Sequence, residues 1–317
     1  MQDILTITLN PAVDLSTATD QVEPGPKLRC DPPRSDPGGG GINVSRTIRV
    51  LGGRSRALVA LGGATGRMLR DLLQAEGIDY LPFRAPGETR QSLAVTDRGT
   101  GQQYRFVMPG PAWDEAHSVA MLAMIGQSVI RDGYVVVSGS NPPGLQEDFI
   151  TRVAARLEGS GAKLIVDTSG PALRHLATPP AKTPPPYVLR MDQEEAEALA
   201  GRPLPARADS AGFAARLVEE GAAAVVIVAR GADGSVLAAG GRRLHVAAAD
   251  VPIRSKVGAG DSFVGAFTLS LARNASLAKA LQHGAAAASA TVITEATQLC
   301  TREDTARLVA ESVLSEL

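Results

Sequence analysis

The sequence predicts an α/β fold, in which a mostly parallel sheet is covered by helices on both faces and carries a small β-strand lid. Short runs of branched apolar residues alternate with stretches of helical length along most of the 317 residues. These runs are continuously apolar, which is typical of strands that are buried on both faces. One hairpin pattern with alternating residues interrupts this order, so we expect it to form a separate lid.

The first third of the chain contains the lid segments and two strand-to-helix units. A polar stretch punctuated by prolines follows the first strand, and the hairpin comes later, around the turn residues 97–101. We therefore expect one domain over residues 1–317, with lid segments at about 12–36 and 88–108. The other expected elements are a strand at 3–9, a helix at 42–48 that closes at Gly52–Gly53, a strand at 57–61 and a helix at 67–76.

The rest of the chain continues the alternation of strands and helices. A proline-rich connector at residues 179–186 is expected to be a surface loop. The expected elements are strands at 134–140, 163–167, 187–190 and 223–228, a hairpin-like pair over 235–246, and helices at 149–157, 276–293 and 302–314.

Composition argues against several classes of protein. The net charge of -1 and the aromatic content of 3% give no support for nucleic-acid binding, which relies on positive charge and on rings that stack with bases. The apolar runs are too short to span a bilayer and the first residues lack an export signal, so we expect a cytoplasmic protein without membrane contact. Cys30 and Cys300 are then expected to be reduced. The four histidines show no metal-ligand spacing.

The stretch from Ser255 to Ser262 places two glycines and the carboxylate of Asp261 at the start of an apolar helix. Unpaired N–H groups and the positive end of the helix dipole favour an anion there, and glycines let it approach the backbone closely. A carboxylate beside a bound phosphate can accept a proton from an attacking hydroxyl, so the motif indicates phosphoryl transfer. The alternative is that Asp261 only caps the helix and that the glycines make a tight turn.

A second glycine-rich helix entrance, Gly38–Gly41, precedes the helix expected at 42–48. Four glycines directly before an amphipathic helix indicate close approach of a ligand or a strand, whereas a linker is the alternative. Arg90 and Arg105 lie at the base of the hairpin. They are either residues of a binding site or charges exposed to solvent. No Walker A or Rossmann glycine motif occurs, so those nucleotide folds lose their main support.

Polar residues follow several of the expected strands, and ligands of such sheets bind beyond the carboxyl ends of the strands. The residues that could converge on one cleft are Asp14, the Gly38 turn, Ser140, Asp167, Arg190 and Asp261. Asp192 and Glu195 share one face of a helix start, where they could order Mg²⁺ through water. They fit a capping box equally, with Asp192 as the N-cap residue.

These motifs resemble the PfkB (ribokinase-like) family of sugar kinases over nearly the whole chain. Both signature regions are present, Gly38–Val44 followed by Gly52–Gly53, and Val257–Ser262. Within the family the chain is most similar to the 6-phosphofructokinases, in the stretches Lys27–Cys30, Gly62–Gly66, Gln103–Gly110, Ser138–Ser140 and Pro142–Gly144. The resemblance implies a ribokinase-like fold and a kinase that uses ATP and Mg²⁺ to phosphorylate fructose 6-phosphate at its 1-hydroxyl.

The family's functional residues can be carried over to matching positions. Asp261 matches the catalytic base, and Gly258, Ala259 and Gly260 match the anion hole for the transferred phosphate. Gly231 and Gly234 match the nucleotide loop. The positions that match the sugar-phosphate site are Asp14, Lys27, Gly39, Gly40, Asn43, Arg90, Arg105 and Ser140. The resemblance also implies a homodimer formed through the lid, and it leaves room for a K⁺ site near Val257 and residues 291–296.

The chain departs from the family pattern across the expected cleft from Asp261. The N-x-x-E element, which orders Mg²⁺ and the phosphates, begins with Asp192 and ends with Glu195, and Arg190 replaces a lysine of the nucleotide site. Arg190 keeps the positive charge, whereas Asp192 adds a negative charge near a polyphosphate. The alternatives that stay open are 1-phosphofructokinase, tagatose-6-phosphate kinase, and a catalytically weakened sensor that binds the sugar phosphate.

Overall fold

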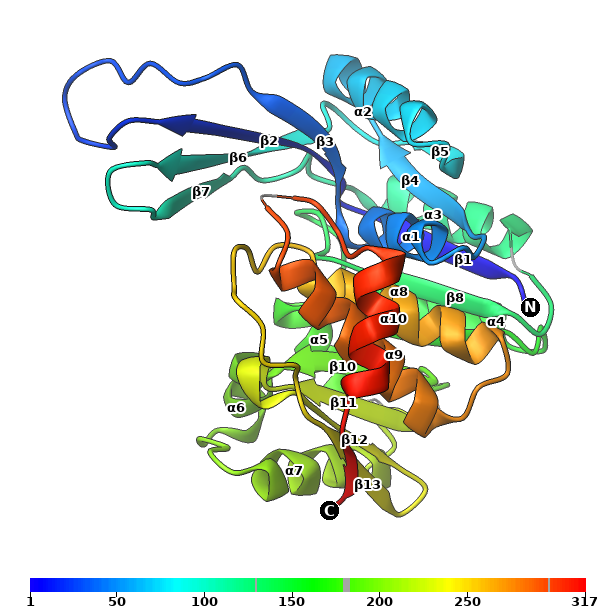
Figure 1. Ribbon diagram of the computed structural model, residues 1–317. Helices are drawn as coiled ribbons and strands as arrows, with labels where there is room; N and C mark the ends of the chain where they lie inside the picture. Colours follow the sequence, from blue (N-terminus) through cyan, green and yellow to red (C-terminus); the bar gives the residue numbers. More distant parts are fainter. Residues whose placement is uncertain (129, 179–182, 296) are drawn as a thin grey trace.

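The protein is described here by a computed structural model, which covers residues 1–128, 130–178, 183–295 and 297–317 (Figure 1). Its main sheet has ten strands, and the seven from β5 to β11 run parallel to one another. In spatial order the strands are β14 (Leu314–Glu316), β13 (Arg242–Val246), β12 (Ser235–Ala239), β11 (Val225–Ala229), β10 (Val188–Asp192), β9 (Lys163–Asp167), β8 (Tyr134–Ser138), β1 (Ile4–Thr8), β4 (Arg56–Leu61) and β5 (Asp79–Arg84).

Helices cover both faces of this sheet. The described helices are α1 (Gly40–Val50), α2 (Gly63–Ala75), α3 (Glu115–Ser128), α4 (Phe149–Leu157), α5 (Gly170–Ala177), α6 (Gln193–Ala200), α7 (Arg207–Glu219), α8 (Ala259–Ala272), α9 (Leu277–Val292) and α10 (Arg302–Glu311), with a short 3-10 turn η1 (Gly231–Asp233).

The two faces of the sheet bury alternate residues of each central strand. Val135 and Val137 of β8 pack into the cluster formed by α3 to α7, whereas Tyr134 and Val136 pack into the cluster formed by α1, α8 and α9. This two-sided burial explains why the strands are apolar throughout. The predicted fold class is therefore confirmed.

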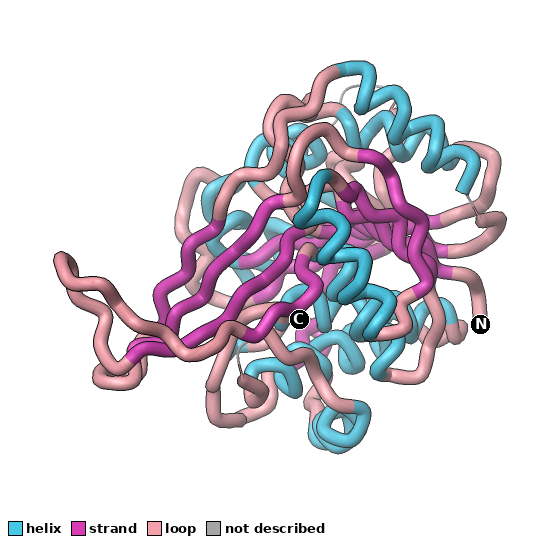
Figure 2. Tube along the Cα trace, turned by 90° about the horizontal axis from the view of Figure 1, so that it is seen from above, coloured by secondary structure: helices cyan, strands magenta, loops and turns pink. Residues whose placement is uncertain are grey.

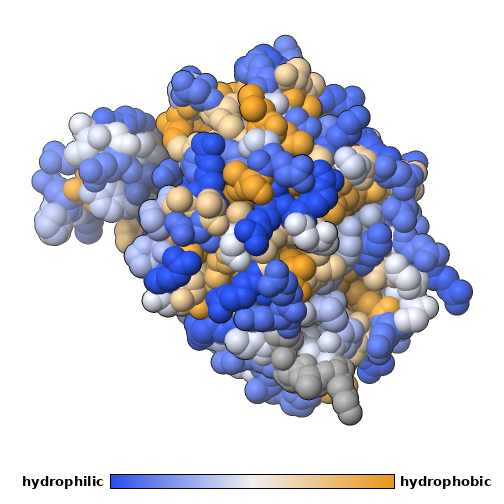
Figure 3. All heavy atoms as spheres, turned by 90° about the horizontal axis from the view of Figure 1, so that it is seen from below, coloured by the Kyte–Doolittle hydropathy of each residue, from blue (hydrophilic) through white to orange (hydrophobic). Residues whose placement is uncertain are grey.

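A separate four-stranded sheet forms the lid, in the order β3 (Arg34–Gly38), β2 (Ala12–Thr19), β6 (Arg90–Asp97) and β7 (Gln103–Val107). β2 and β6 pair in parallel, and β3 and β7 form the two antiparallel edges. Figure 2 shows the lid projecting to one side of the main sheet. Seen from below, this projecting part exposes mainly hydrophilic residues (Figure 3).

The structure differs from the expected elements at a few points. The last helix was expected to reach Leu314 but ends at Glu311, and the next residues form β14, which pairs with β13. β5, α5 and α7 were not expected. Part of the proline-rich connector, residues 179–182, lies outside the described residues. Over the part of the chain that is described, no helix combines the length and apolarity that a membrane span requires.

Candidate active site

Asp261 lies in the first turn of α8, whose N-cap is Gly258. Gly258 has φ 77°, a left-handed conformation that glycine adopts without strain. Its carbonyl accepts the N–H of Ser262 at 2.8 Å, which starts the helix. The first N–H groups of a helix have no intrahelical acceptors, so this turn, with Gly260 beside Asp261, can receive an anion.

The carboxylate of Asp261 is held by two side chains from other elements. Asn43 Nδ2 of α1 donates to Oδ2 at 2.9 Å, and Ser138 Oγ at the end of β8 donates to Oδ1 at 3.3 Å. The pKa of Asp261 is raised to about 7, chiefly by burial and also by the nearby Asp167, although Asn43, Arg190 and Ser138 oppose this rise. A carboxylate with a pKa near neutrality is suited to general base catalysis.

The glycine-rich entrance to α1 packs directly against the end of β8. Gly39, the N-cap residue of α1, has φ 116°. A side-chain carbon on Gly40 would lie 2.6 Å from the carbonyl carbon of Ser138 and 2.7 Å from the nitrogen of Gly139. Only glycine fits there, and the close packing of α1 on β8 places Asn43 beside Asp261.

A pocket of about 200 Å³ opens between the lid and the starts of α1 and α8. It brings together most of the residues predicted for the sugar-phosphate and phosphoryl-transfer sites, namely Asp14, Gly39, Gly40, Asn43, Arg90, Arg105, Gly258 and Asp261. Ser92 and Thr297 also line it and were not predicted.

Two charged residues of this pocket, Asp14 and Arg90, influence each other's ionisation. Burial raises the pKa of Asp14, and the positive charge of Arg90 is the largest influence that opposes this rise. Burial lowers the pKa of Arg90, whose Nε donates to the carbonyl of Asn10 at 3.2 Å. The pocket therefore holds a buried carboxylate beside a guanidinium, two groups of the kinds that bind hydroxyls and phosphates.

Two predicted sugar-site residues lie outside the lining of this pocket. Lys27 is exposed, in the loop that joins β2 to β3 at the tip of the lid. Ser140 is also exposed, two residues beyond Ser138, and its Oγ accepts a 3.3 Å hydrogen bond from Asn10 Nδ2. Neither role is tested by this arrangement, but Lys27 would need the lid loop, or another chain, to bring it to the pocket.

Arg190 of β10 lies beside the start of α8. Its Nη1 donates to Asp167 Oδ1 at 2.9 Å, and its guanidinium carbon lies 5.3 Å from the centre of the Phe263 ring. A side-chain carbon on Gly260 would lie 3.2 Å from Arg190 Nη1. Asp167 was expected among the residues that converge on one cleft, without a role of its own, and the structure places it beside Arg190 as an ion-pair partner.

Asp192 and Glu195 form the capping box that the sequence left open. Asp192 Oδ1 accepts the N–H of Glu195 at 2.8 Å, and Glu195 Oε2 accepts the N–H of Asp192 at 2.9 Å. Burial raises the pKa of Glu195, and the negative charges of Asp192 and Asp167 add to this rise. A hydrated cation would relieve this repulsion. The two residues therefore fit Mg²⁺ held through water.

The predicted nucleotide loop is the turn η1 and the glycine that follows it. Gly231 and Gly234 both have positive φ, 58° and 91°. A side-chain carbon on Gly234 would lie 2.7 Å from the nitrogen of Ala248. Asp233 bonds to Arg207 and Arg230, and these contacts, Arg207 first, lower the pKa of Asp233 to about 2. The loop is thus held by ion pairs on its outer side.

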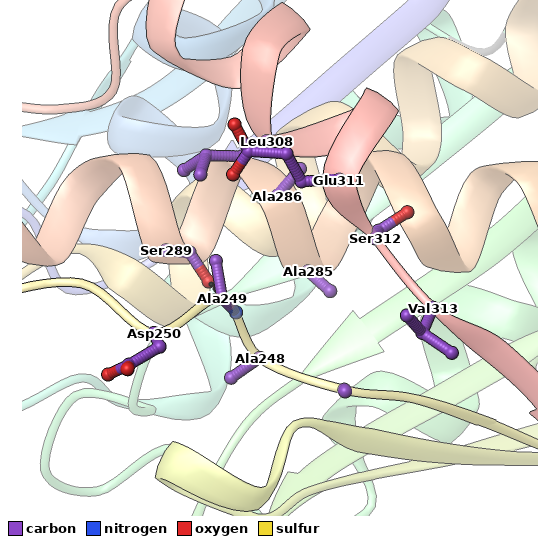
Figure 4. A pocket seen from close by; sticks show the side chains of 11 residues that line it. Ala248, Ala249, Asp250, Ala285, Ala286, Ser289, Leu308, Glu311, Ser312 and Val313 are labelled. Atoms are coloured by element: carbon purple, nitrogen blue, oxygen red, sulfur yellow. Dashed lines mark hydrogen bonds between the residues drawn. The ribbon is translucent and has the colours of Figure 1, made fainter.

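A second pocket, of about 240 Å³, lies next to this loop (Figure 4). Residues 247–250 form one wall, and Ala285, Ala286 and Ser289 of α9 face them. Glu311, at the end of α10, lies at its border. The small side chains of the alanines leave space for a flat ring, and Asp250, Ser289, Glu311 and Ser312 add polar groups to the lining.

The predicted K⁺ site near Val257 and residues 291–296 is only partly described, because residue 296 lies outside the described residues. In the described part, Thr294 Oγ1 approaches the carbonyl oxygens of Thr291 and Gln298, both at 2.7 Å.

Comparison with known proteins agrees with this geometry. The model of the pfkB family of carbohydrate kinases matches residues 2–304. The ATP-dependent 6-phosphofructokinase isozyme 2 of Escherichia coli is 39% identical over 312 residues, which cover 98% of this chain and 99% of that protein. The 1-phosphofructokinase of Xanthomonas campestris is 31% identical over 269 residues, which cover 84% of this chain and 83% of that protein.

The fold also matches solved structures. The crystal structure of E. coli phosphofructokinase-2 in complex with fructose-6-phosphate has a TM-score of 0.90 and 37% identity, over 98% of this chain and 99% of that chain. Other structures of the E. coli protein include a complex with potassium and a tetrameric inhibited form.

The fold and the cleft are those of a ribokinase-like kinase. The chain belongs to the pfkB family of carbohydrate kinases, which confirms the enzyme class predicted from the sequence, an ATP-dependent sugar-phosphate kinase.

Proposed function

We propose that the protein transfers the terminal phosphate of ATP to the 1-hydroxyl of fructose 6-phosphate, giving fructose 1,6-bisphosphate and ADP. The observation that carries the proposal is the position of Asp261. Its carboxylate, with a pKa of about 7, lines the same pocket as Arg90, Arg105 and Asp14. A base, a phosphate-binding pair and a hydroxyl-binding carboxylate are thus available to one substrate.

On the sugar side, Asp14 and Asn43 bind hydroxyl groups, and the backbone of Gly39 and Gly40 lies beside them. Arg90 and Arg105 bind the 6-phosphate, because guanidinium groups pair with phosphate through two N–H donors. Lys27 and Ser140 complete this site when the sugar phosphate and the lid come together.

In the transfer step Asp261 accepts the proton of the 1-hydroxyl as its oxygen bonds to the terminal phosphorus of ATP. The bond from that phosphorus to the bridging oxygen breaks, and ADP leaves with the electron pair. Amide N–H groups of Gly258, Ala259 and Gly260, with the guanidinium of Arg190, stabilise the negative charge on the transferred phosphate. Asp192 and Glu195 would hold Mg²⁺ through water, and the ion would supply positive charge against the phosphates of ATP.

The nucleotide occupies the side of the cleft formed by Gly231 and Gly234. The 240 Å³ pocket next to this loop takes the base, since residues 248 and 249 and the facing alanines of α9 leave room for a flat ring. A K⁺ ion bound by carbonyl oxygens near Val257 would support the start of α8, in line with the potassium complex of the E. coli protein.

The first alternative keeps this chemistry and changes the sugar phosphate. The X. campestris relative is a 1-phosphofructokinase, and one pair of arginines can accept a phosphate at either end of a ketohexose. Initial rates with ATP and Mg²⁺ should be compared for fructose 6-phosphate, fructose 1-phosphate and tagatose 6-phosphate. A higher kcat/KM for either of the last two would replace the proposed substrate.

The second alternative is a sensor that binds the sugar phosphate without efficient transfer, as the unusual Asp192 and Arg190 would allow. Binding of fructose 6-phosphate by calorimetry, with no ADP formed in the presence of ATP and Mg²⁺, would favour it. If Asp192→Asn leaves the Mg²⁺ dependence of the rate unchanged, the proposed metal contact is wrong.

We also propose that residues 1–317 act as one kinase domain in the cytoplasm, where ATP and sugar phosphates are available, and that two copies pair through their lids. β3 and β7 are lid edges whose backbone groups can extend a sheet. The lid exposes four large apolar side chains, of Leu28, Phe106, Val107 and Met108. Burying them against a second copy would cover this apolar surface.

A further inference from the structure

The side-chain amide of Asn43 can adopt two orientations, which differ in whether its oxygen or its amino group faces Asp261. In the structure Nδ2 lies 2.9 Å from Asp261 Oδ2, and Oδ1 lies 3.1 Å from Arg46 Nη1. A guanidinium has N–H donors and no acceptor, so the oxygen of Asn43 is the atom that can meet Arg46. Arg46 therefore selects the orientation in which Asn43 donates to Asp261.

Arg46 is in turn held from outside the pocket. Its side chain is buried in α1, and its Nε and Nη2 each donate a 2.7 Å bond to the carboxylate of Glu76, the C-cap residue of α2. Its Nη1 also reaches the carbonyl of Pro37 at 3.3 Å. A guanidinium bound at both edges has a fixed plane, so the direction of the bond to Asn43 is fixed as well.

We propose that Arg46, anchored by Glu76, is a positioning residue for phosphoryl transfer, which holds Asn43 as a hydrogen-bond donor to Asp261 and so keeps the base unprotonated. This inference rests on the proposed role of Asp261 as the base. In the opposite orientation the oxygen of Asn43 would face the carboxylate, and only a protonated Asp261 could donate to it. The protonated form would be favoured, and less base would be present at neutral pH.

Charged groups from other elements also act on this site and must be separated from the effect of Arg46. Asp167 at the end of β9 raises the pKa of Asp261, and Arg190 of β10 lowers it. Burial raises the pKa of Asp14 in β2, and Arg46 is one of the positive charges that oppose this rise. Replacing Arg46 could therefore act through Asn43 or through Asp14, and the test has to distinguish these routes.

The test is the pH dependence of kcat/KM, measured with ATP, Mg²⁺ and the sugar phosphate that gives the highest turnover. Arg46→Met removes the donor to Asn43 and should move the acidic limb upward by about one pH unit, the effect of one hydrogen bond to a charged group. Arg46→Lys keeps a donor and should restore part of the shift. Glu76→Gln weakens the anchor in a partly exposed position and should give a smaller upward shift.

Arg152→Gln is the matched control, because Arg152 forms a similar two-bond pair with Glu115 on the surface, between α4 and α3. This variant should keep the native pH profile. An unmoved acidic limb in Arg46→Met, whether or not its thermal midpoint falls, would overturn the proposal.

A second arm repeats Arg46→Met in an Asn43→Ala background. If Arg46 acts through Asn43, it should cause no further shift there, because the two substitutions remove one interaction. An equal shift in both backgrounds would assign the effect to Asp14 instead and would refute the inference. Asp261→Asn is measured in parallel. If this variant keeps the native rate, the proposed role of Asp261 as the base is wrong. If it is inactive and Arg46→Met has the native pH profile, only the inference about Arg46 is overturned.

Discussion

Arg190 and Asp167 form an ion pair between adjacent parallel strands, with Nη1 and Oδ1 2.9 Å apart and with the two residues paired in register. Both side chains are largely buried, at 12% and 15% exposed. Arg190 Nε has no hydrogen-bond partner among the described residues. The ion pair therefore holds the guanidinium beside Gly260.

Asp167→Asn should destabilise the protein, since it leaves Arg190 without its counter-charge. Breaking a buried ion pair on one side costs about 3 kcal/mol or more. The free energy of unfolding from urea titration at pH 7 would measure this. The control is Asp79→Asn, which removes an exposed pair with Arg56 and should change little; equal small effects would show that the Arg190 pair contributes no more than a surface contact.

Activity should fall as the pH drops below about 7, because Asp261 must be unprotonated to accept the proton of the hydroxyl. The logarithm of kcat/KM should then decline with a slope of about one per pH unit. Asp261→Asn should lower kcat by about 10²- to 10⁴-fold and remove this limb. A variant that retains the limb would assign it to another group, such as the phosphate of the substrate.

The same carboxylate should make stability depend on pH. The pKa of Asp261 is raised in the folded state, so the folded chain binds more protons than the unfolded chain between about pH 4 and about pH 7. The contribution of this group to stability therefore falls as the pH rises through that range. Asp261→Asn should resist urea better than the native chain at pH 8, and the difference should shrink at pH 5; the reverse order would contradict the burial of this charge.

Gly40→Ala should disrupt the start of α1, because its side chain would collide with the backbone at Ser138 and Gly139. A loss of about 1–3 kcal/mol in stability is expected, with loss of activity. Gly126→Ala is the matched control: Gly126 lies within α3 with open space around it, and alanine there should stabilise the helix slightly. Equal thermal midpoints for the two variants would argue against tight packing of α1 on β8.

The proposed lid dimer predicts that charge on the exposed lid will separate the copies. The double variant Leu28→Glu with Met108→Glu should shift the mass in sedimentation equilibrium from dimer to monomer at micromolar concentration. Val119→Glu, at a site on α3 that is 50% exposed, is the control and should leave the dimer intact. A native chain that sediments as a monomer, or a double variant that remains dimeric, would refute the lid interface.

Sequence patterns predicted the sheet, the lid strands and the two glycine-rich helix starts, because each of these features is encoded by residues that are close together in the sequence. They missed β14, a three-residue edge strand. Its sequence is too short to show a strand pattern, and its extended structure depends on pairing with β13. β5 was missed because Pro82 and charged ends weaken its strand pattern.

The site was predicted in part for a similar reason. Asp261 and Asn43 stand in recognisable motifs. Thr297 lies in a loop that lines the pocket, and its Oγ1 donates to Asp36 of the lid at 2.6 Å. The two residues are 261 positions apart, so no local pattern reveals their contact. Ser138 was predicted only as part of the family-like stretch Ser138–Ser140 at the end of a buried strand, and its hydrogen bond to Asp261 was not predicted.

The order of the elements along the chain also bears on how such enzymes diversify. The lid and the arginines proposed to bind the sugar phosphate come from the first 108 residues, and the turn η1 with its neighbouring pocket comes from residues after 230. The two stretches pack on one another through α1 and α8, and Asn43 meets Asp261 at this contact. Mutations in the first stretch can therefore change the proposed sugar site without touching the residues proposed for the nucleotide, but exchange of N-terminal segments between relatives must preserve the packing of α1 on α8.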